Sequence, residues 1–210
     1  MVGDSESEAS WREFFAWLKS RDLRGVDIVV SDSHTGLVRA LQTQFQGCTW
    51  QRCQTHFMRN VLDACPKSMQ EEICKRVRAI LNAPDMNTAR LLRDQFVEEY
   101  AQRAPKVTQV FEDGFDDATA VLALPERYRR RLRTTNSVER LNEEIRRRER
   151  VIRIFPNRES VIRLVGALLM EIDEAWMTGH RYLNMEAFLQ WRQEQENTPY
   201  HEDKVARLSR

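Results

Sequence analysis

Two carboxylates that lie far apart in the sequence are the strongest candidates for chemistry. Asp32 ends the short apolar run of residues 28–31, and Glu139 lies near the start of a predicted helix amid arginines. Carboxylates bind hard cations such as Mg²⁺, which prefer oxygen ligands, and a local basic surface attracts a polyanion. The pattern therefore favours metal-dependent chemistry on a phosphate backbone.

Both acids also have a purely structural interpretation, which the residues alone leave open. Asp32 can cap the helix that follows it, because aspartate accepts hydrogen bonds from free amides at a helix start. Asn136 and Glu139 have the spacing of a capping-box variant, in which the glutamate satisfies a backbone amide. The observation that supports a functional role for Asp32 is its place at the carboxyl end of a strand, where open α/β sheets bind their ligands; from position alone the cap is the more common role.

A basic segment flanks Glu139 on both sides. Hydroxyls, an amide side chain and helix N-terminal amides accompany its guanidinium groups, and all of these groups bind phosphate without reading bases. A solvated, salt-bridged surface is the alternative interpretation. The candidate DNA-binding residues are Arg130, Arg131, Arg133, Thr134, Thr135, Asn136, Arg140, Arg146, Arg147 and Arg148.

Cys53 and His56 form a Cys-x-x-His motif directly after a second predicted strand. With Cys48 and Cys65 they offer four ligands for zinc, although their spacing matches no common zinc pattern. A histidine beside a metal can instead donate to a phosphate or a leaving oxygen. A buried, reduced cysteine next to a histidine at a helix start is the alternative without chemistry.

The composition is that of an ordinary globular protein, with 41% hydrophobic and 31% charged residues among 210. A net charge of +1 does not point to nucleic acid, so only the local basic segment does. No apolar run is long enough for a membrane span, and the first residues lack the features of a signal peptide. Four cysteines within one short region, without a secretion signal, favour reduced thiols in the cytoplasm.

The hydrophobic pattern predicts a small α/β piece followed by helices. A capping box of Ser5 and Glu8 starts the first helix, and β-branched runs predict strands at 26–31 and 49–52. A helix at 37–45 between them gives the order helix–strand–helix–strand, which favours a parallel pair. Further helices are predicted at 57–64, 69–82, 86–100, 107–114, 160–177 and 185–195, with a flexible tail at 197–210.

Several segments, taken in order, resemble the Mutator-type family of bacterial insertion-sequence transposases. Residues 132–142, LRTTNSVERLN, are the most specific of them. Residues 2–11 (VGDSESEASW), 29–37 (VVSDSHTGL), 51–60 (QRCQTHFMRN) and 153–157 (RIFPN) add to the match. The resemblance extends from residue 2 to about residue 191.

The resemblance implies a ribonuclease-H-like core in which an Asp-Asp-Glu triad binds two divalent metal ions. By motif, Asp32 is similar to the second aspartate and Glu139 to the glutamate, so Mg²⁺ or Mn²⁺ is the implied cofactor. Cys53 and His56 match a short motif beside that active site, and His56 is expected to assist at the phosphate. The first aspartate has no counterpart, since Asp4 falls in another motif. The expected fold is α/β, a partial ribonuclease-H-like core without its first three strands, with a large helical insertion and C-terminal helices.

The implied domains are a partial core at 1–56, a helical insertion at 57–133, a glutamate helix with C-terminal helices at 134–196, and the tail at 197–210. The implied function is that of a fragment of a transposase that cleaves and joins DNA. Double-stranded DNA, at transposon ends and target, is the expected partner; the intact protein is expected to be a homo-oligomer at the bacterial nucleoid, with no membrane partner.

Two other functions stay open. Without the first aspartate, the chain alone is expected to be inactive, which favours a remnant that binds DNA or full-length transposase and regulates transposition. A helical domain with a zinc knuckle is the structural alternative.

Overall fold

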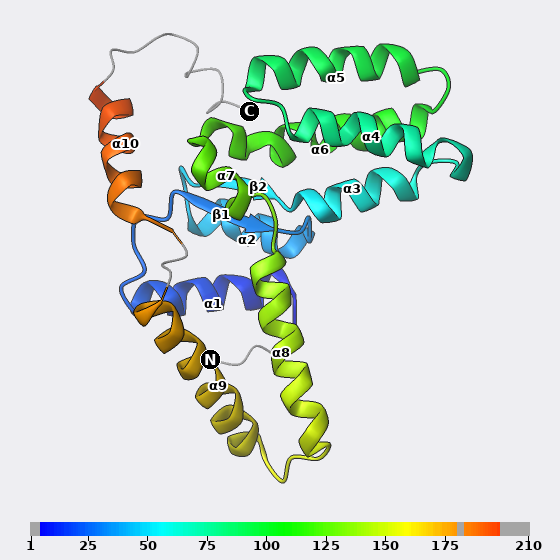
Figure 1. Ribbon diagram of the computed structural model, residues 1–210. Helices are drawn as coiled ribbons and strands as arrows, with labels where there is room; N and C mark the ends of the chain where they lie inside the picture. Colours follow the sequence, from blue (N-terminus) through cyan, green and yellow to red (C-terminus); the bar gives the residue numbers. More distant parts are fainter. Residues whose placement is uncertain (1–4, 180–182, 198–210) are drawn as a thin grey trace. The chain divides into compact units, whose positions relative to one another are not determined.

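The computed structural model describes residues 5–179 and 183–197. The chain divides into two compact units, Met1–Asn142 and Glu143–Arg210. Its described part is mostly helical and holds one small parallel sheet, so the α/β class is confirmed in coarse form (Figure 1).

In chain order the elements are α1 (Glu8–Ser20), β1 (Ile28–Ser31), α2 (Thr35–Gln44), β2 (Thr49–Arg52), α3 (Gln54–Asp63), η1 (Lys67–Met69), α4 (Gln70–Leu81), α5 (Met86–Tyr100), α6 (Pro105–Thr119), η2 (Ala120–Ala123), α7 (Glu126–Leu132), α8 (Asn136–Ile152), α9 (Arg158–Thr178) and α10 (Met185–Asn197).

The two strands form the predicted parallel pair. Ile28 lies opposite Thr49, and Ser31 lies opposite Arg52. Because the strands are parallel and in this register, the residues that follow them leave the same edge of the sheet next to one another. β2 has the predicted bounds, whereas β1 begins two residues later than predicted.

A small core joins α1 and α2 to the sheet. Phe15, Ala40 and Leu41 are its buried residues, and the rings of Phe15 and Phe45 lie 5.2 Å apart between centroids. The prediction that Ser5 caps α1 is wrong. The cap is Ser7, whose hydroxyl accepts from the Ser10 amide at 3.2 Å and so satisfies a free donor of the first turn.

A larger core lies among α3, α4, α5 and α6, which Figure 1 shows packed alongside one another. Phe57, Val77, Phe96 and Phe111 are among its fully or almost fully buried side chains. Two helices of this core differ most from the sequence prediction. α3 begins three residues earlier, at Gln54, and α6 runs through Gly114 to Thr119 because close packing against other elements compensates for the helix-weakening glycine.

The second unit holds most of α8, together with α9 and α10. Arg148 of α8 lies 3.8 Å from Glu171 of α9, and Glu144 accepts hydrogen bonds from Arg147 and Arg148. These guanidinium groups lower the pKa of Glu144 to about 2. The helices predicted at 160–177 and 185–195 are α9 and α10, each slightly longer. The predicted flexible tail lies outside the described residues from residue 198 onward.

Candidate functional site

Three potential metal ligands meet in the first unit. Ligand atoms of Cys53, His56 and Glu139 all lie within 4.8 Å of one another. Cys53 follows β2 and is the N-cap of α3, His56 lies in the first turn of that helix, and Glu139 lies in the first turn of α8. The structure thus brings together the Cys-x-x-His motif and a residue more than eighty positions away, which the sequence pattern alone does not predict.

Thr135 connects these side chains. Its hydroxyl donates to Glu139 Oε1 at 2.9 Å and lies 3.4 Å from Cys53 Sγ, while its backbone amide donates to the same sulfur at 3.5 Å. His56 Nε2 lies 4.0 Å from Glu139 Oε1. Thr135 was predicted as a phosphate contact, and its place between the cysteine and the glutamate was missed, because it depends on pairing across 82 residues.

The Cys53 thiol is fully buried and lies in a polar environment. Burial by itself raises the pKa of the thiol. Hydrogen bonding by Thr135 and by the backbone amide of His56 outweighs burial, so the pKa of Cys53 lies below its ordinary value. Relative to an isolated cysteine, these hydrogen bonds thus lower the pKa of Cys53, and the thiolate is the form that binds metals.

Backbone contacts hold this cluster in place. The Cys53 amide donates to the Ser31 carbonyl at 2.7 Å, which extends the sheet by one residue. The Gln54 amide donates to the Arg133 carbonyl at 2.9 Å, and this bond fixes the linker between α7 and α8 against the start of α3. As a result, the first turn of α8 and its glutamate are directed to the carboxyl edge of the sheet.

Asp32 leaves the same edge directly after β1. Since Ser31 pairs with Arg52, the next residues of the two strands, Asp32 and Cys53, are neighbours at the sheet edge. The Asp32 side chain is exposed and accepts from the His34 amide at 3.3 Å. It does not cap α2, whose N-cap is His34. Among the described residues, the three-ligand cluster does not include Asp32.

Glu139 does not form the capping box considered from the sequence. Its carboxylate points to the Thr135 hydroxyl rather than to a backbone amide, and Asn136 is already the first helical residue. The four-ligand zinc set is wrong as well. Cys48 and Cys65 stay outside the cluster, and their thiols donate to the carbonyls of Thr49 and Pro66.

The candidate ligands differ in the kind of cation that their donor atoms suit. Carboxylate oxygens, which Asp32 and Glu139 offer, are donors that fit Mg²⁺ or Mn²⁺. The sulfur of Cys53 does not fit a hard cation, whereas it fits zinc. Oxygen donors therefore suit magnesium better than the sulfur of Cys53 does.

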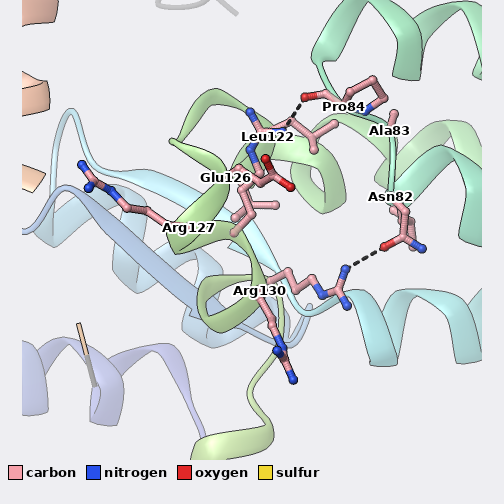
Figure 2. Close-up of a pocket in the computed structure, with 11 residues that line it drawn as sticks. Asn82, Ala83, Pro84, Leu122, Glu126, Arg127 and Arg130 are labelled. Atoms are coloured by element: carbon pink, nitrogen blue, oxygen red, sulfur yellow. Dashed lines mark hydrogen bonds between the residues drawn. The ribbon is translucent and has the colours of Figure 1, made fainter. Parts of the chain in front are cut away.

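Part of the predicted basic segment lines a pocket of about 670 Å³ between α7, η2 and the turn from α4 to α5. Figure 2 shows Glu126 facing this pocket and Arg127 directed away from it. Arg133 donates to Asn82 Oδ1 at 2.7 Å, so its guanidinium also supports the pocket wall. Arg130, a further lining residue, makes no hydrogen bond or ion pair within the described part of the chain.

The other predicted DNA contacts are less uniform. Arg131, Asn136, Arg140 and Arg146 are exposed, while Thr134 is half-buried. Arg147 and Arg148 are engaged by Glu144, as described above, so their charge is partly compensated.

Comparison with known proteins decides the family. The sequence model described as "Transposase, Mutator family" matches residues 1–179. This chain belongs to the Mutator family of transposases.

Named relatives of this family are insertion-sequence transposases. The transposase for IS256 in transposon Tn4001 of Staphylococcus aureus is 40% identical over 190 residues, which cover 89% of this chain and 48% of that protein. The transposase for ISRM5 of Rhizobium meliloti is 40% identical over 181 residues, 86% of this chain and 46% of that protein. The transposase for IS1081 of Mycobacterium tuberculosis is 37% identical over 185 residues, 88% and 45% of the two chains. The chain thus spans about half the length of these curated relatives.

The resemblance to the Mutator transposases that was read from the sequence is thereby confirmed. Within the described part of this family member, no helix combines the length and the apolar character needed to cross a bilayer.

Proposed function

We propose that this chain is the part of an insertion-sequence transposase that holds a divalent metal ion for cleavage and joining of DNA. One observation carries the proposal. Ser31 pairs with Arg52 at the end of the two strands, and Thr135 contacts both Cys53 and Glu139; together these contacts support one metal site for Asp32 and Glu139 at this end of the parallel pair. Ligand sites of α/β proteins occur at this edge.

Asp32 and Glu139 are the proposed ligands, and Mg²⁺ is the proposed ion, with Mn²⁺ as a substitute. When bound, such an ion activates an oxygen nucleophile and stabilises the leaving oxygen of a phosphodiester. Thr135 orients the Glu139 carboxylate through its 2.9 Å hydrogen bond. His56, whose side chain is 31% exposed and lies 4.0 Å from Glu139, would donate to a phosphate oxygen.

The proposed nucleic-acid contacts lie before and after Glu139 in the sequence. Arg130 and Arg133 of the pocket, with the hydroxyls of Thr134 and Thr135 and the Asn136 amide at the start of α8, would bind the phosphate backbone. Arg131 of α7 and Arg140 of α8 would extend the contact, and Arg146, Arg147 and Arg148 of the second unit are proposed as further DNA contacts.

The finer architecture belongs to the same proposal. Residues 1–56 would be a partial ribonuclease-H-like core, 57–133 a helical insertion, and 134–196 the glutamate helix with C-terminal helices. Double-stranded DNA would be the partner, and the intact enzyme would act as a homo-oligomer at the bacterial nucleoid.

Two readouts with matched variants test the proposal. Mn²⁺ binding is measured by water proton relaxation, and Mg²⁺-dependent nicking is measured on labelled DNA that carries transposon ends. Asp32→Asn and Glu139→Gln remove the proposed ligands. Asp22→Asn and Glu143→Gln are the controls, because Asp22 lies in an exposed turn with φ 68° and Glu143 is an exposed residue further along α8.

We expect both ligand variants to lose Mn²⁺ affinity while the controls keep it. Equal Mn²⁺ binding by all variants would exclude these two residues as the metal site. Metal binding and salt-dependent DNA binding without nicking would instead favour the remnant that regulates transposition.

A further inference from the structure

We propose that Cys53, His56 and Glu139 form a binding site for zinc, separate in its donor chemistry from the proposed magnesium pair. Thiolate sulfur, imidazole nitrogen and carboxylate oxygen are the three ligand types that proteins use for zinc. Magnesium and calcium, in contrast, are bound almost entirely by oxygen. Of these three donors, only Glu139 suits both kinds of ion.

The geometry is close to what zinc requires. Ligand atoms bonded to one tetrahedral zinc ion lie about 2.0–2.3 Å from it, and hence about 3–4 Å from one another. The three donors here lie within 4.8 Å of one another, so a closure of about 1 Å is sufficient. Rotation of the His56 and Glu139 side chains, which are 31% and 47% exposed, can supply this closure while Cys53 stays in place.

The surroundings of the three donors fit a metal site. Cys53 Sγ lies within hydrogen-bonding distance of both the amide and the hydroxyl of Thr135, and the same hydroxyl holds Glu139. Hydrogen bonds of this kind orient the ligands of metal sites. His56 Nδ1 is buried without a hydrogen-bond partner in the described part of the chain, so no competing protein group holds that ring atom. Three protein ligands leave the fourth zinc position to water or a phosphate oxygen.

A regulatory consequence follows, and it rests on the proposed function. Glu139 is a ligand in both proposed sites, so zinc at this cluster competes with magnesium for its carboxylate. Zinc should then inhibit magnesium-dependent nicking, and a chelator selective for zinc should restore it.

Zinc binding is tested on the whole chain without DNA. Isothermal titration gives the zinc affinity, and Co²⁺ as a substitute reports a sulfur ligand through its thiolate charge-transfer absorption. Cys53→Ser and His56→Gln are the test variants. Cys48→Ser, Cys65→Ser and His34→Gln are controls for other thiols and for another histidine near the sheet edge.

We expect one tight zinc site per chain, a thiolate absorption band, and a loss of zinc affinity of at least about tenfold in both test variants. The controls should keep both the affinity and the band. Circular dichroism shows that each variant is folded, and a charge-transfer band that survives in folded Cys53→Ser overturns the proposal, as does absence of zinc binding.

Asp32→Asn separates the two proposals. This change removes a proposed magnesium ligand and leaves the zinc donors intact, so zinc binding should persist. If the chain binds zinc but Asp32→Asn does not change its Mn²⁺ affinity, the magnesium pair is contradicted and the zinc site stands. If the chain binds Mn²⁺ but not zinc, the zinc site is contradicted and the magnesium pair stands.

Discussion

The Gln51 side chain accepts a hydrogen bond from the Val121 amide at 2.6 Å, and so joins β2 to the end of the helical segment. The same side chain donates to the Ala118 carbonyl at 2.8 Å. Gln51 is fully buried, and both polar atoms of its amide have partners. This one residue therefore anchors η2 against the strand that leads to Cys53.

Replacement of Gln51 should destabilise the fold. Gln51→Leu leaves the buried Val121 amide without an acceptor, and we expect the free energy of unfolding to fall by about 2–3 kcal/mol. Urea denaturation followed by circular dichroism measures the loss. Gln42→Leu, at an exposed position on α2, should change stability by less than about 0.5 kcal/mol. Equal stability of the two variants would refute the anchoring role.

Gly114 leaves no room for a larger residue. A Cβ there would lie 2.4 Å from a guanidinium nitrogen of Arg52 and 2.6 Å from the ring of buried Phe57. Gly114→Ala should lower stability by about 1–3 kcal/mol despite the better helix propensity of alanine. Gly166→Ala, which meets nothing within 4 Å on α9, should instead raise the melting temperature slightly. Stabilisation by both changes would contradict the packing argument.

Tyr100 predicts a dependence of stability on alkaline pH. Burial, followed by the hydrogen bond to Glu72, raises the pKa of Tyr100 from 10.0 to about 12. The folded chain holds the phenolic proton more tightly, so this stabilisation is complete below pH 10 and is lost as pH rises toward 12. Between pH 10 and 12, the free energy of unfolding of the unsubstituted chain should fall by on the order of 2 kcal/mol more than that of Tyr100→Phe. Parallel stability curves for the two proteins would contradict the raised pKa.

Thr135 should control the metal ligands without being one. Thr135→Val removes the hydroxyl that holds Glu139 and leaves the backbone amide bond to Cys53. We expect Mn²⁺ affinity, measured by relaxation, to fall by about tenfold. Thr135→Ser keeps a hydroxyl and should restore most of the affinity. Identical affinity in the valine and serine variants would show that the hydroxyl has no positioning role.

Arg130 offers a test of the basic pocket. Its guanidinium has no partner in the described structure, whereas Arg76 is paired with Glu99 at 2.9 Å on the helical segment. Arg130→Ala should weaken DNA binding for all sequences alike and reduce the slope of log affinity against log salt by about 0.9. Arg76→Ala should leave this slope unchanged. The measurement is fluorescence anisotropy with unrelated duplexes over a range of salt.

The strand pair could be predicted from the sequence because it depends on local patterns. Thr49–Arg52 is bounded by turn residues and carries β-favouring side chains, and its bounds were correct. The start of α3 was missed because Gln54 breaks the apolar pattern. The polar Gln54 side chain is nevertheless buried, since it donates to the Ala118 carbonyl, 64 residues away.

Local sequence patterns also led to the candidate ligands of the site. Asp32 and Glu139 were proposed as ligands from their neighbours in sequence, and this role stays a prediction. The structure adds the contacts of Glu139 with Thr135 and the place of Asp32 directly after β1. The connection through Thr135 depends on the backbone bond between Gln54 and Arg133, which no local pattern encodes.

The two hydrophobic cores differ in size, and this difference sets how tightly each half of the site is held. Asp32 follows β1, whose Val29 packs on the small cluster around Phe15, whereas Cys53 adjoins the large cluster of α3–α6. Segments with fewer buried contacts open at lower free-energy cost. Amide hydrogens of β1 and α2 should therefore exchange with solvent faster than those of α3 and α6. Asp32 would then lie in the part of the site that opens more often, and Cys53 in the part that opens less often.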